Sequence, residues 1–117
     1  MDYKFLGQVN NSEELKKLNY SEIYDLCDEI RDMLISTVSK NGGHLASNLG
    51  VVELTVALHR FLNLPDDALI FDVGHQCYTH KLLTGRYENF TTIRQENGIS
   101  GFMRPDESVY DAFVTGH

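Results

Sequence analysis

Three glycine–histidine pairs are the residues of this sequence best suited to chemistry: Gly43-His44, Gly74-His75 and Gly116-His117. A glycine lets backbone N–H groups approach an anion closely, and imidazole donates hydrogen bonds and titrates near neutral pH. A single Gly-His pair at a strand end is common and is only a weak indication of function, but three pairs together are a stronger one. The pattern favours a ligand that contains phosphate.

The remaining histidines and the cysteines leave alternatives open. His59 fits a surface or packing position, and His80 fits either a structural or a functional one. A zinc site within "HQCYTH" requires a non-helical segment, because on a helix Cys77 and His80 are rotated by about 200° and 140° from His75. Nucleophilic catalysis has less support, since Cys77 lacks an activating arrangement and no serine lies in a Gly-x-Ser-x-Gly turn.

Capping residues and apolar spacing predict several helices along the chain. Asn11 or Ser12 can cap a short helix through Leu18, and Ser21 can cap a longer one that ends at Gly42. The longer helix has apolar residues at three- and four-residue steps, which predicts one buried face: Ile23, Leu26, Cys27, Ile30, Met33, Leu34 and Val38.

A further helix is expected to begin near Ser47 or Asn48 and to continue to Leu62, and another lies within residues 75–86. Residues 87–106 read as irregular, because glycines and a proline interrupt the apolar pattern.

Two short apolar runs predict strands. "ALIFDV", residues 68–73, and "YDAFVTGH", residues 110–117, are separated by a helix and a loop, which is typical of a parallel α/β sheet flanked by helices. Ligands of such sheets bind beyond the carboxyl ends of strands, where the Gly74 and Gly116 turns would lie beside loop 41–47. Two strands are too few for a stable sheet, so residues 1–117 are expected to be one incomplete α/β domain.

The overall composition is that of an ordinary globular protein, with 42% apolar and 23% charged residues. Ten Lys and Arg against seventeen Asp and Glu give a net charge of −7, which disfavours nucleic acid and anionic lipid as partners. Two cysteines in separate segments, with no basic and apolar leader, predict a cytoplasmic protein.

Long motifs in the chain resemble one family. "GGHLASNLGVVELTVALHRFLNLPDDALIFDVGHQCYTHKLLTGR", "TIRQENGISGF" and "YDAFVTGH" are similar to the N-terminal part of the 1-deoxy-D-xylulose-5-phosphate synthases, which are transketolase-like thiamine diphosphate enzymes. The resemblance implies condensation of pyruvate with D-glyceraldehyde 3-phosphate and release of CO2. It also implies a homodimer, thiamine diphosphate with Mg²⁺, and a product used in isoprenoid, thiamine and pyridoxal phosphate synthesis.

The resemblance also implies roles for individual residues. His44 would lie over the reacting carbon of the cofactor, where it positions substrate oxygens and moves protons. Ser47 would lie near the cofactor diphosphate. His75 and the turn of Gly116 and His117 would contact thiamine diphosphate.

Parts of the family pattern are not present within these residues. The Gly-Asp-Gly motif and downstream asparagine that hold magnesium and diphosphate lie outside, as does the glutamate that activates the aminopyrimidine ring. We therefore expect an N-terminal fragment that is inactive alone, with its metal ligands elsewhere. The alternative is a non-catalytic helical interaction module on the same scaffold.

Overall fold

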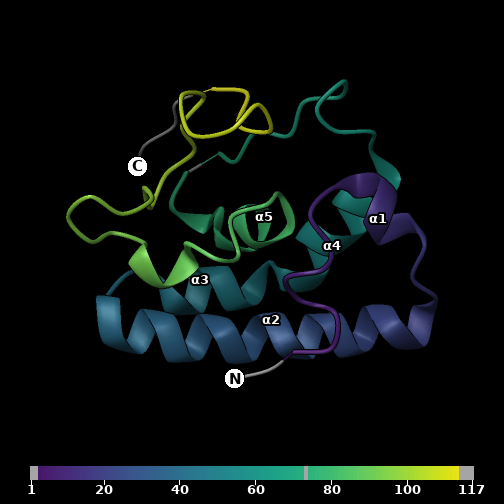
Figure 1. The fold of residues 1–117 in the computed structure, drawn as a ribbon, viewed down its shortest axis with the longest axis horizontal. Coiled ribbons are helices and arrows are strands. Elements are labelled where there is room, and N and C mark those ends of the chain that lie inside the picture. The colour runs from purple at the N-terminus through teal and green to yellow at the C-terminus, as the bar shows by residue number, and fades with distance from the viewer. Residues whose placement is uncertain (1–2, 73, 114–117) are drawn as a thin grey trace.

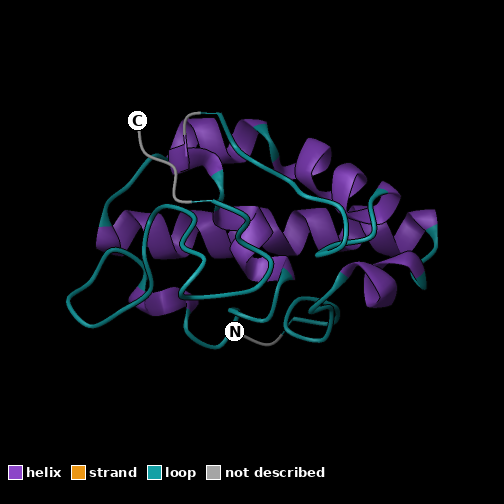
Figure 2. Ribbon diagram, turned by 90° about the horizontal axis from the view of Figure 1, so that it is seen from above, coloured by secondary structure: helices purple, strands orange, loops and turns teal. Residues whose placement is uncertain are grey.

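The computed structural model describes residues 3–72 and 74–113, and helices and irregular loops make up this part of the chain (Figures 1 and 2). The helices, in chain order, are α1 (Ser12–Lys16), α2 (Tyr20–Asn41), α3 (Leu45–Gly50), α4 (Val52–Phe61) and α5 (Tyr78–Leu83), with two 3₁₀ turns, η1 (Gly74–Gln76) and η2 (Phe90–Thr92).

The predicted α/β sheet is wrong, because no strand forms within the described residues. Residues 68–72 run without regular structure, and Ile70 is 49% exposed, although a sheet strand covered by helices would bury it. Residues 110–113 are likewise irregular, and the rest of that predicted strand lies outside the described residues. A strand needs a neighbouring backbone to accept and donate its hydrogen bonds, and the described parts of the two runs form no such ladder.

The long helix α2 forms one side of the molecule, α3, α4 and α5 pack on it, and α1 packs on α4 (Figure 1). Its predicted apolar face is confirmed, because Leu26, Ile30 and Leu34 are fully buried. The predicted cap at Ser21 is wrong. Asn19 caps the helix instead, in a reciprocal capping box with Glu22 that satisfies two otherwise unpaired N–H groups.

The predicted helix from about residue 47 to 62 is in fact two helices. α3 begins earlier, at Leu45. The helix is interrupted at Val51, and α4 begins at the next residue. At the break, the N–H of Val51 donates to the carbonyl of Asn48 at 3.3 Å, one residue nearer than an α-helical bond requires. The interruption lets the axis of α3 take a different direction from that of α4. The first residues of α3 then lie beside η1.

The irregular lead-in before α1 is tied down by one carboxylate. Glu29 of α2 accepts hydrogen bonds from the backbone N–H groups of Lys4, Phe5 and Leu6, at 2.9, 3.0 and 2.8 Å. Asn11 then caps α1 as predicted, by accepting from the N–H of Glu14. The lead-in is therefore part of the folded unit.

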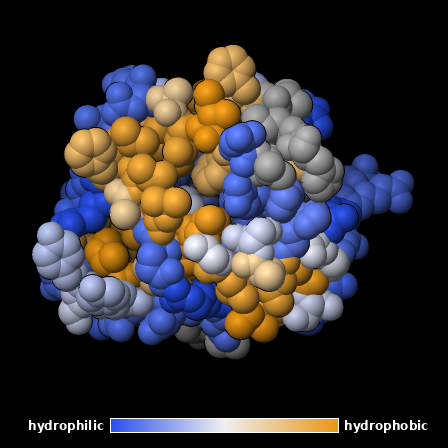
Figure 3. All heavy atoms as spheres, turned by 180° about the vertical axis from the view of Figure 1, so that it is seen from behind, coloured by the Kyte–Doolittle hydropathy of each residue, from blue (hydrophilic) through white to orange (hydrophobic). Residues whose placement is uncertain are grey.

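One face of the molecule carries apolar side chains between hydrophilic areas (Figure 3). Among the described residues, several large apolar side chains remain exposed: Tyr20, Tyr24, Ile35, Leu54, Phe61, Ile70, Val109 and Phe113. None of the helices in the described ranges is long and apolar enough to cross a membrane.

Candidate functional site

His44 and His75, which are 31 positions apart, lie against each other. Their ring centroids are 4.0 Å apart, with an angle of 34° between the ring planes. His44 is the last residue before α3 and is exposed, while His75 is half-buried in η1. Two of the three predicted glycine–histidine pairs are thus brought to one place, where two imidazole rings share a common surface.

The two glycines before His44 are explained by local crowding. Gly43 has φ of 132°, in the region that residues with a side chain rarely adopt. A Cβ atom at Gly43 would lie 2.8 Å from the hydroxyl oxygen of Tyr78 and 3.2 Å from a guanidinium nitrogen of Arg94. Only glycine lets the backbone pass this close to α5. The position of the His44 imidazole depends on this path of the backbone.

Replacement of Gly43 by alanine is expected to displace His44 from His75. The change combines an unfavourable backbone conformation with a contact closer than van der Waals distance, and each such strain costs about 1–3 kcal/mol. Gly50 offers a matched control, because nothing lies within 4 Å of the position its Cβ would occupy. Thermal unfolding of both alanine variants should show a loss of stability for Gly43→Ala, and a stable Gly43→Ala protein would contradict the packing argument.

A small cavity of about 70 Å³ opens beside the two rings. It is lined by His44, His75, Tyr78, Arg94, Gly101 and Phe102. Burial raises the pKa of the Tyr78 phenol, so Tyr78 remains a neutral hydroxyl at physiological pH. The cavity therefore combines two imidazoles, a phenol and one guanidinium, a set that suits an anionic or carbonyl-containing group.

Arg94 is the lining residue that sequence reasoning missed. It follows η2 with φ of 63°, and its N–H donates to the carbonyl of Ile99 at 2.9 Å, so a tight turn presents the side chain. Asn41, at the end of α2, holds the same turn by donating to the carbonyls of Thr91 and Ile93 at 2.8 and 2.9 Å. Nothing in the local spacing indicates this placement, which depends on contacts across 50 residues.

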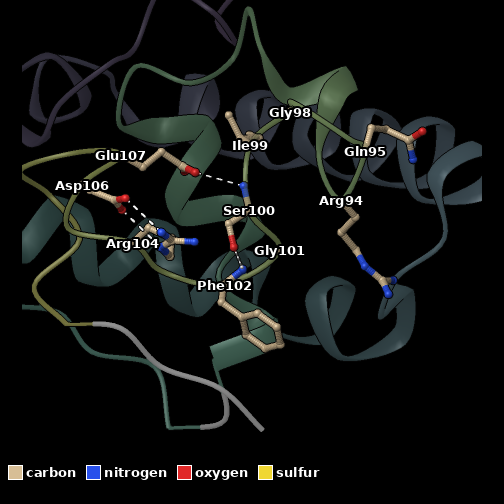
Figure 4. Close-up of a pocket in the computed structure, with 10 residues that line it drawn as sticks. All are labelled: Arg94, Gln95, Gly98, Ile99, Ser100, Gly101, Phe102, Arg104, Asp106 and Glu107. Atoms are coloured by element: carbon tan, nitrogen blue, oxygen red, sulfur yellow. Dashed lines mark hydrogen bonds and ion pairs between the residues drawn. The ribbon is translucent and has the colours of Figure 1, made fainter.

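A larger, open pocket of about 640 Å³ adjoins this cavity and shares Arg94, Gly101 and Phe102 with it. Figure 4 shows Arg94 extending away from the other polar side chains of this pocket. Arg104 is paired with Asp106 through hydrogen bonds of 3.1 and 2.9 Å, so its charge is already compensated. Arg94 is therefore the better placed of the two arginines to meet a ligand near the histidines.

The other predicted site residues have different outcomes. Ser47 lies on α3 with its hydroxyl 3.4 Å from the carbonyl oxygen of His44, which places it near the paired rings. Gly116 and His117 lie outside the described residues. The alternative zinc site finds no support in the geometry, because His75 stacks on His44 while the thiol of Cys77 donates to the carbonyl of Gly101 at 3.7 Å. Burial raises the pKa of that thiol to about 12, which makes it a poor nucleophile.

His59 and His80 belong to a buried polar network, which we define as His59, His80, Lys81, Arg86, Glu107 and Asp111. The Asp111 carboxylate accepts from Nε2 of His80 at 2.9 Å, and Nδ1 of His80 lies 2.9 Å from Nε2 of His59. Because a carboxylate only accepts hydrogen bonds, His80 carries its proton on Nε2. Its Nδ1 then accepts a hydrogen bond from the Nε2–H of His59. His59 and His80 are both completely buried. The sequence left a surface or a packing position open for His59, and it is a packing position. It left a structural or a functional role open for His80, and the role is structural.

Cations and carboxylates balance within this network. Arg86 donates to both oxygens of Asp111 at 2.6 and 2.8 Å and to Glu107 at 2.8 Å. Lys81 donates to the same oxygen of Glu107 at 2.5 Å. The network joins α4, α5 and the loop that contains Asp111, and so fixes the approach of that loop to the rest of the molecule.

Lowering the pH from 7 to 5 is expected to destabilise the fold through the two buried histidines. Burial, with smaller effects of the neighbouring His80 and Arg86, lowers the pKa of His59 to about 3. At pH 5 His59 is then neutral in the folded state and protonated in the unfolded state, so its contribution to stability is complete above about pH 6.5 and declines by about 1.4 kcal/mol per pH unit below it. Burial also lowers the pKa of His80, which acts in the same direction.

Thermal unfolding followed by circular dichroism at several pH values measures this effect. The variant His59→Phe removes one titration without leaving a cavity, so its stability should fall less steeply with decreasing pH. An identical pH dependence of the variant and the parent would contradict a neutral, buried His59.

Known proteins are similar to this chain over almost its whole length. The family model for 1-deoxy-D-xylulose-5-phosphate synthase matches residues 6–117. Proteins named 1-deoxy-D-xylulose-5-phosphate synthase are 59% identical in Alkaliphilus oremlandii, over 98% of this chain and 18% of that protein, and 56% identical in Treponema pallidum (strain Nichols), over 100% of this chain and 19% of that protein. The chain thus spans about a fifth of the length of these curated relatives. The paired histidines, their glycine-backed loop and this match over nearly all residues lead to one conclusion: the chain belongs to the 1-deoxy-D-xylulose-5-phosphate synthase family.

Proposed function

We propose that the full-length protein containing this chain condenses pyruvate with D-glyceraldehyde 3-phosphate, releases CO2 and forms 1-deoxy-D-xylulose 5-phosphate. The observation that carries the proposal is the contact of His44 with His75 at 4.0 Å beside a cavity that also receives Arg94. Relatives that bear this enzyme name match over 98% and 100% of the chain, which supports the same activity.

The described residues fit one wall of a thiamine diphosphate site. A cavity of about 70 Å³ is too small for the whole cofactor, since sites for molecules of that size enclose roughly 300 Å³ or more. The wall has suitable chemistry: a glycine-backed loop with no room for a Cβ, two imidazoles and one guanidinium. When bound, the cofactor supplies the electron sink that allows pyruvate to lose CO2.

Within this wall each residue has a separate task. His44, exposed at the start of α3, positions substrate oxygens and transfers protons at its ring nitrogens. His75 contacts the cofactor from the half-buried side. Ser47, on the first turn of α3, lies toward the diphosphate, and Gly116 with His117 complete the contact. Arg94 attracts the anionic substrate into the cavity.

The remaining parts of the site belong to the rest of the protein. Mg²⁺ prefers carboxylate and phosphate oxygens in octahedral geometry, and the described residues contain no cluster of three or more His, Cys, Asp or Glu arranged for a metal. As the family resemblance implies, we propose that the metal ligands lie outside residues 1–117. The complete enzyme is proposed to be a cytoplasmic homodimer whose partners are these small substrates rather than membrane or nucleic acid.

An assay of the purified full-length protein tests the proposal. Pyruvate and D-glyceraldehyde 3-phosphate are supplied with thiamine diphosphate and Mg²⁺, and the pentulose phosphate and CO2 are measured together. Both products should form in equal amounts, and omission of the cofactor should abolish them. A folded protein that binds neither cofactor nor substrate would instead favour a non-catalytic interaction module.

A further inference from the structure

A single buried side chain joins the loops that carry the two histidines. Asn48 of α3 is completely buried, and its amide nitrogen donates to the carbonyl oxygens of both His44 and His75, at 2.7 and 2.9 Å. Its amide oxygen accepts from the backbone N–H of Tyr78 at 3.1 Å. Both hydrogens of the amide are thereby used, and three segments of the chain meet at one side chain.

The two bonds from the amide nitrogen differ in what they accomplish. The carbonyl of His44 also accepts from the backbone N–H of Asn48 at 3.3 Å and lies 3.4 Å from the hydroxyl of Ser47, so α3 can begin without the Asn48 side chain. The bond to the carbonyl of His75 crosses between segments that are 27 residues apart. The bond to Tyr78 similarly ties the first turn of α5 to α3.

We propose that Asn48 is a positioning residue, which sets the distance and tilt between the His44 and His75 rings and so shapes the face that both present to ligands. The planar NH₂ group holds two carbonyls in a fixed relation, and each carbonyl is part of the same residue as one of the stacked rings. The inference rests on the proposed function for its catalytic consequence, but the positioning itself can be measured without turnover.

Two variants of the full-length protein separate positioning from general stability. Asn48→Ala removes all three side-chain bonds, and kcat is expected to fall by about 10²-fold, because a misplacement of about 1 Å costs this much. Asn48→Asp keeps the shape and the acceptor for Tyr78, but an ionised carboxylate has no hydrogen for either carbonyl. Once protonated it regains one donor, so the ratio of kcat of Asn48→Asp to that of Asn48→Ala should rise as the pH falls.

A matched control is Asn19→Ala. Asn19 is also an asparagine whose side chain satisfies backbone groups, but it caps the far end of α2. Its loss is expected to lower the thermal stability while kcat and KM remain those of the parent. A decrease in kcat for Asn19→Ala as large as that for Asn48→Ala would show that loss of stability alone explains the result, and would overturn the proposal.

The independent readout is the NMR spectrum of histidine labelled with ¹³C at Cε1, in the full-length protein. Stacked imidazoles shift each other's ring signals, and variants at His44 and His75 assign them. The shifts should be present in the parent and in Asn19→Ala, and should be lost in both Asn48 variants. Retention of the shifts in Asn48→Asp, which keeps the shape and is therefore the variant expected to fold, overturns the proposal.

The two readouts distinguish the possible failures. If the parent lacks turnover but the ring shifts depend on Asn48, the proposed function fails and the positioning role stands. If the parent is active and the Asn48 variants keep its kcat and its ring shifts, the positioning role fails and the proposed function stands.

Discussion

Turnover of the full-length enzyme is expected to fall by about 10²–10⁴-fold when His44 is replaced by alanine, the range typical for loss of one positioned acid–base group. His44 is exposed at the start of α3, while its ring packs on the half-buried His75. Removal of the exposed ring takes away the proposed proton-transfer group but leaves the supporting loop intact. The affinity for thiamine diphosphate should change much less than kcat.

His75→Ala provides the contrast. Because His75 is half-buried and is the residue proposed to contact the cofactor, its loss should weaken cofactor binding as well as turnover. Steady-state kinetics over a range of thiamine diphosphate concentrations, with calorimetric titration of the cofactor, separates the two variants. Near-normal turnover of His44→Ala would remove His44 from the reaction.

Replacement of Asp111 by alanine is expected to cause the largest loss of stability, about 3–5 kcal/mol, the usual cost of removing one partner of a buried ion pair. Its carboxylate accepts four hydrogen bonds: from His80, two from Arg86, and from the N–H of Arg104 at 2.9 Å. Burial by itself would raise the pKa of Asp111, but these hydrogen bonds and the Arg86 charge hold it well below its usual range. Without Asp111, the buried guanidinium has only Glu107 to balance it.

Hydrogen exchange of the α5 backbone in the full-length protein measures this loss locally. Since about 1.4 kcal/mol corresponds to a factor of ten, protection of α5 should fall by roughly 10²- to 4 × 10³-fold in Asp111→Ala. The control is Asp106→Ala, which breaks an exposed pair with Arg104 and should cost at most about 1 kcal/mol. Equal protection in the two variants would contradict a structural role for the buried polar network.

The sequence by itself determined the local features of this protein. The apolar steps of α2, a cap of α1 at Asn11 or Ser12 and the end of α2 at Gly42 were all predicted, because each depends on residues within one or two helical turns. The residue types of the glycine–histidine pairs also favoured a ligand that contains phosphate, which stays a prediction. The long motifs also carried the family resemblance, which the match to residues 6–117 confirmed.

Only the tertiary structure decided which of these local features meet. The predicted strands did not form within the described residues, because hydrogen bonding in a sheet depends on partners that the local pattern does not contain. A helix was predicted to begin near Ser47 or Asn48, but the side chain of Asn48 joins the segments of His44 and His75, and Arg94 lines the same cavity from another turn. The sequence did not show that His59 and His80 are buried. A buried polar group needs a hydrogen-bond partner, and these two rings bond to each other, which gives both a structural role.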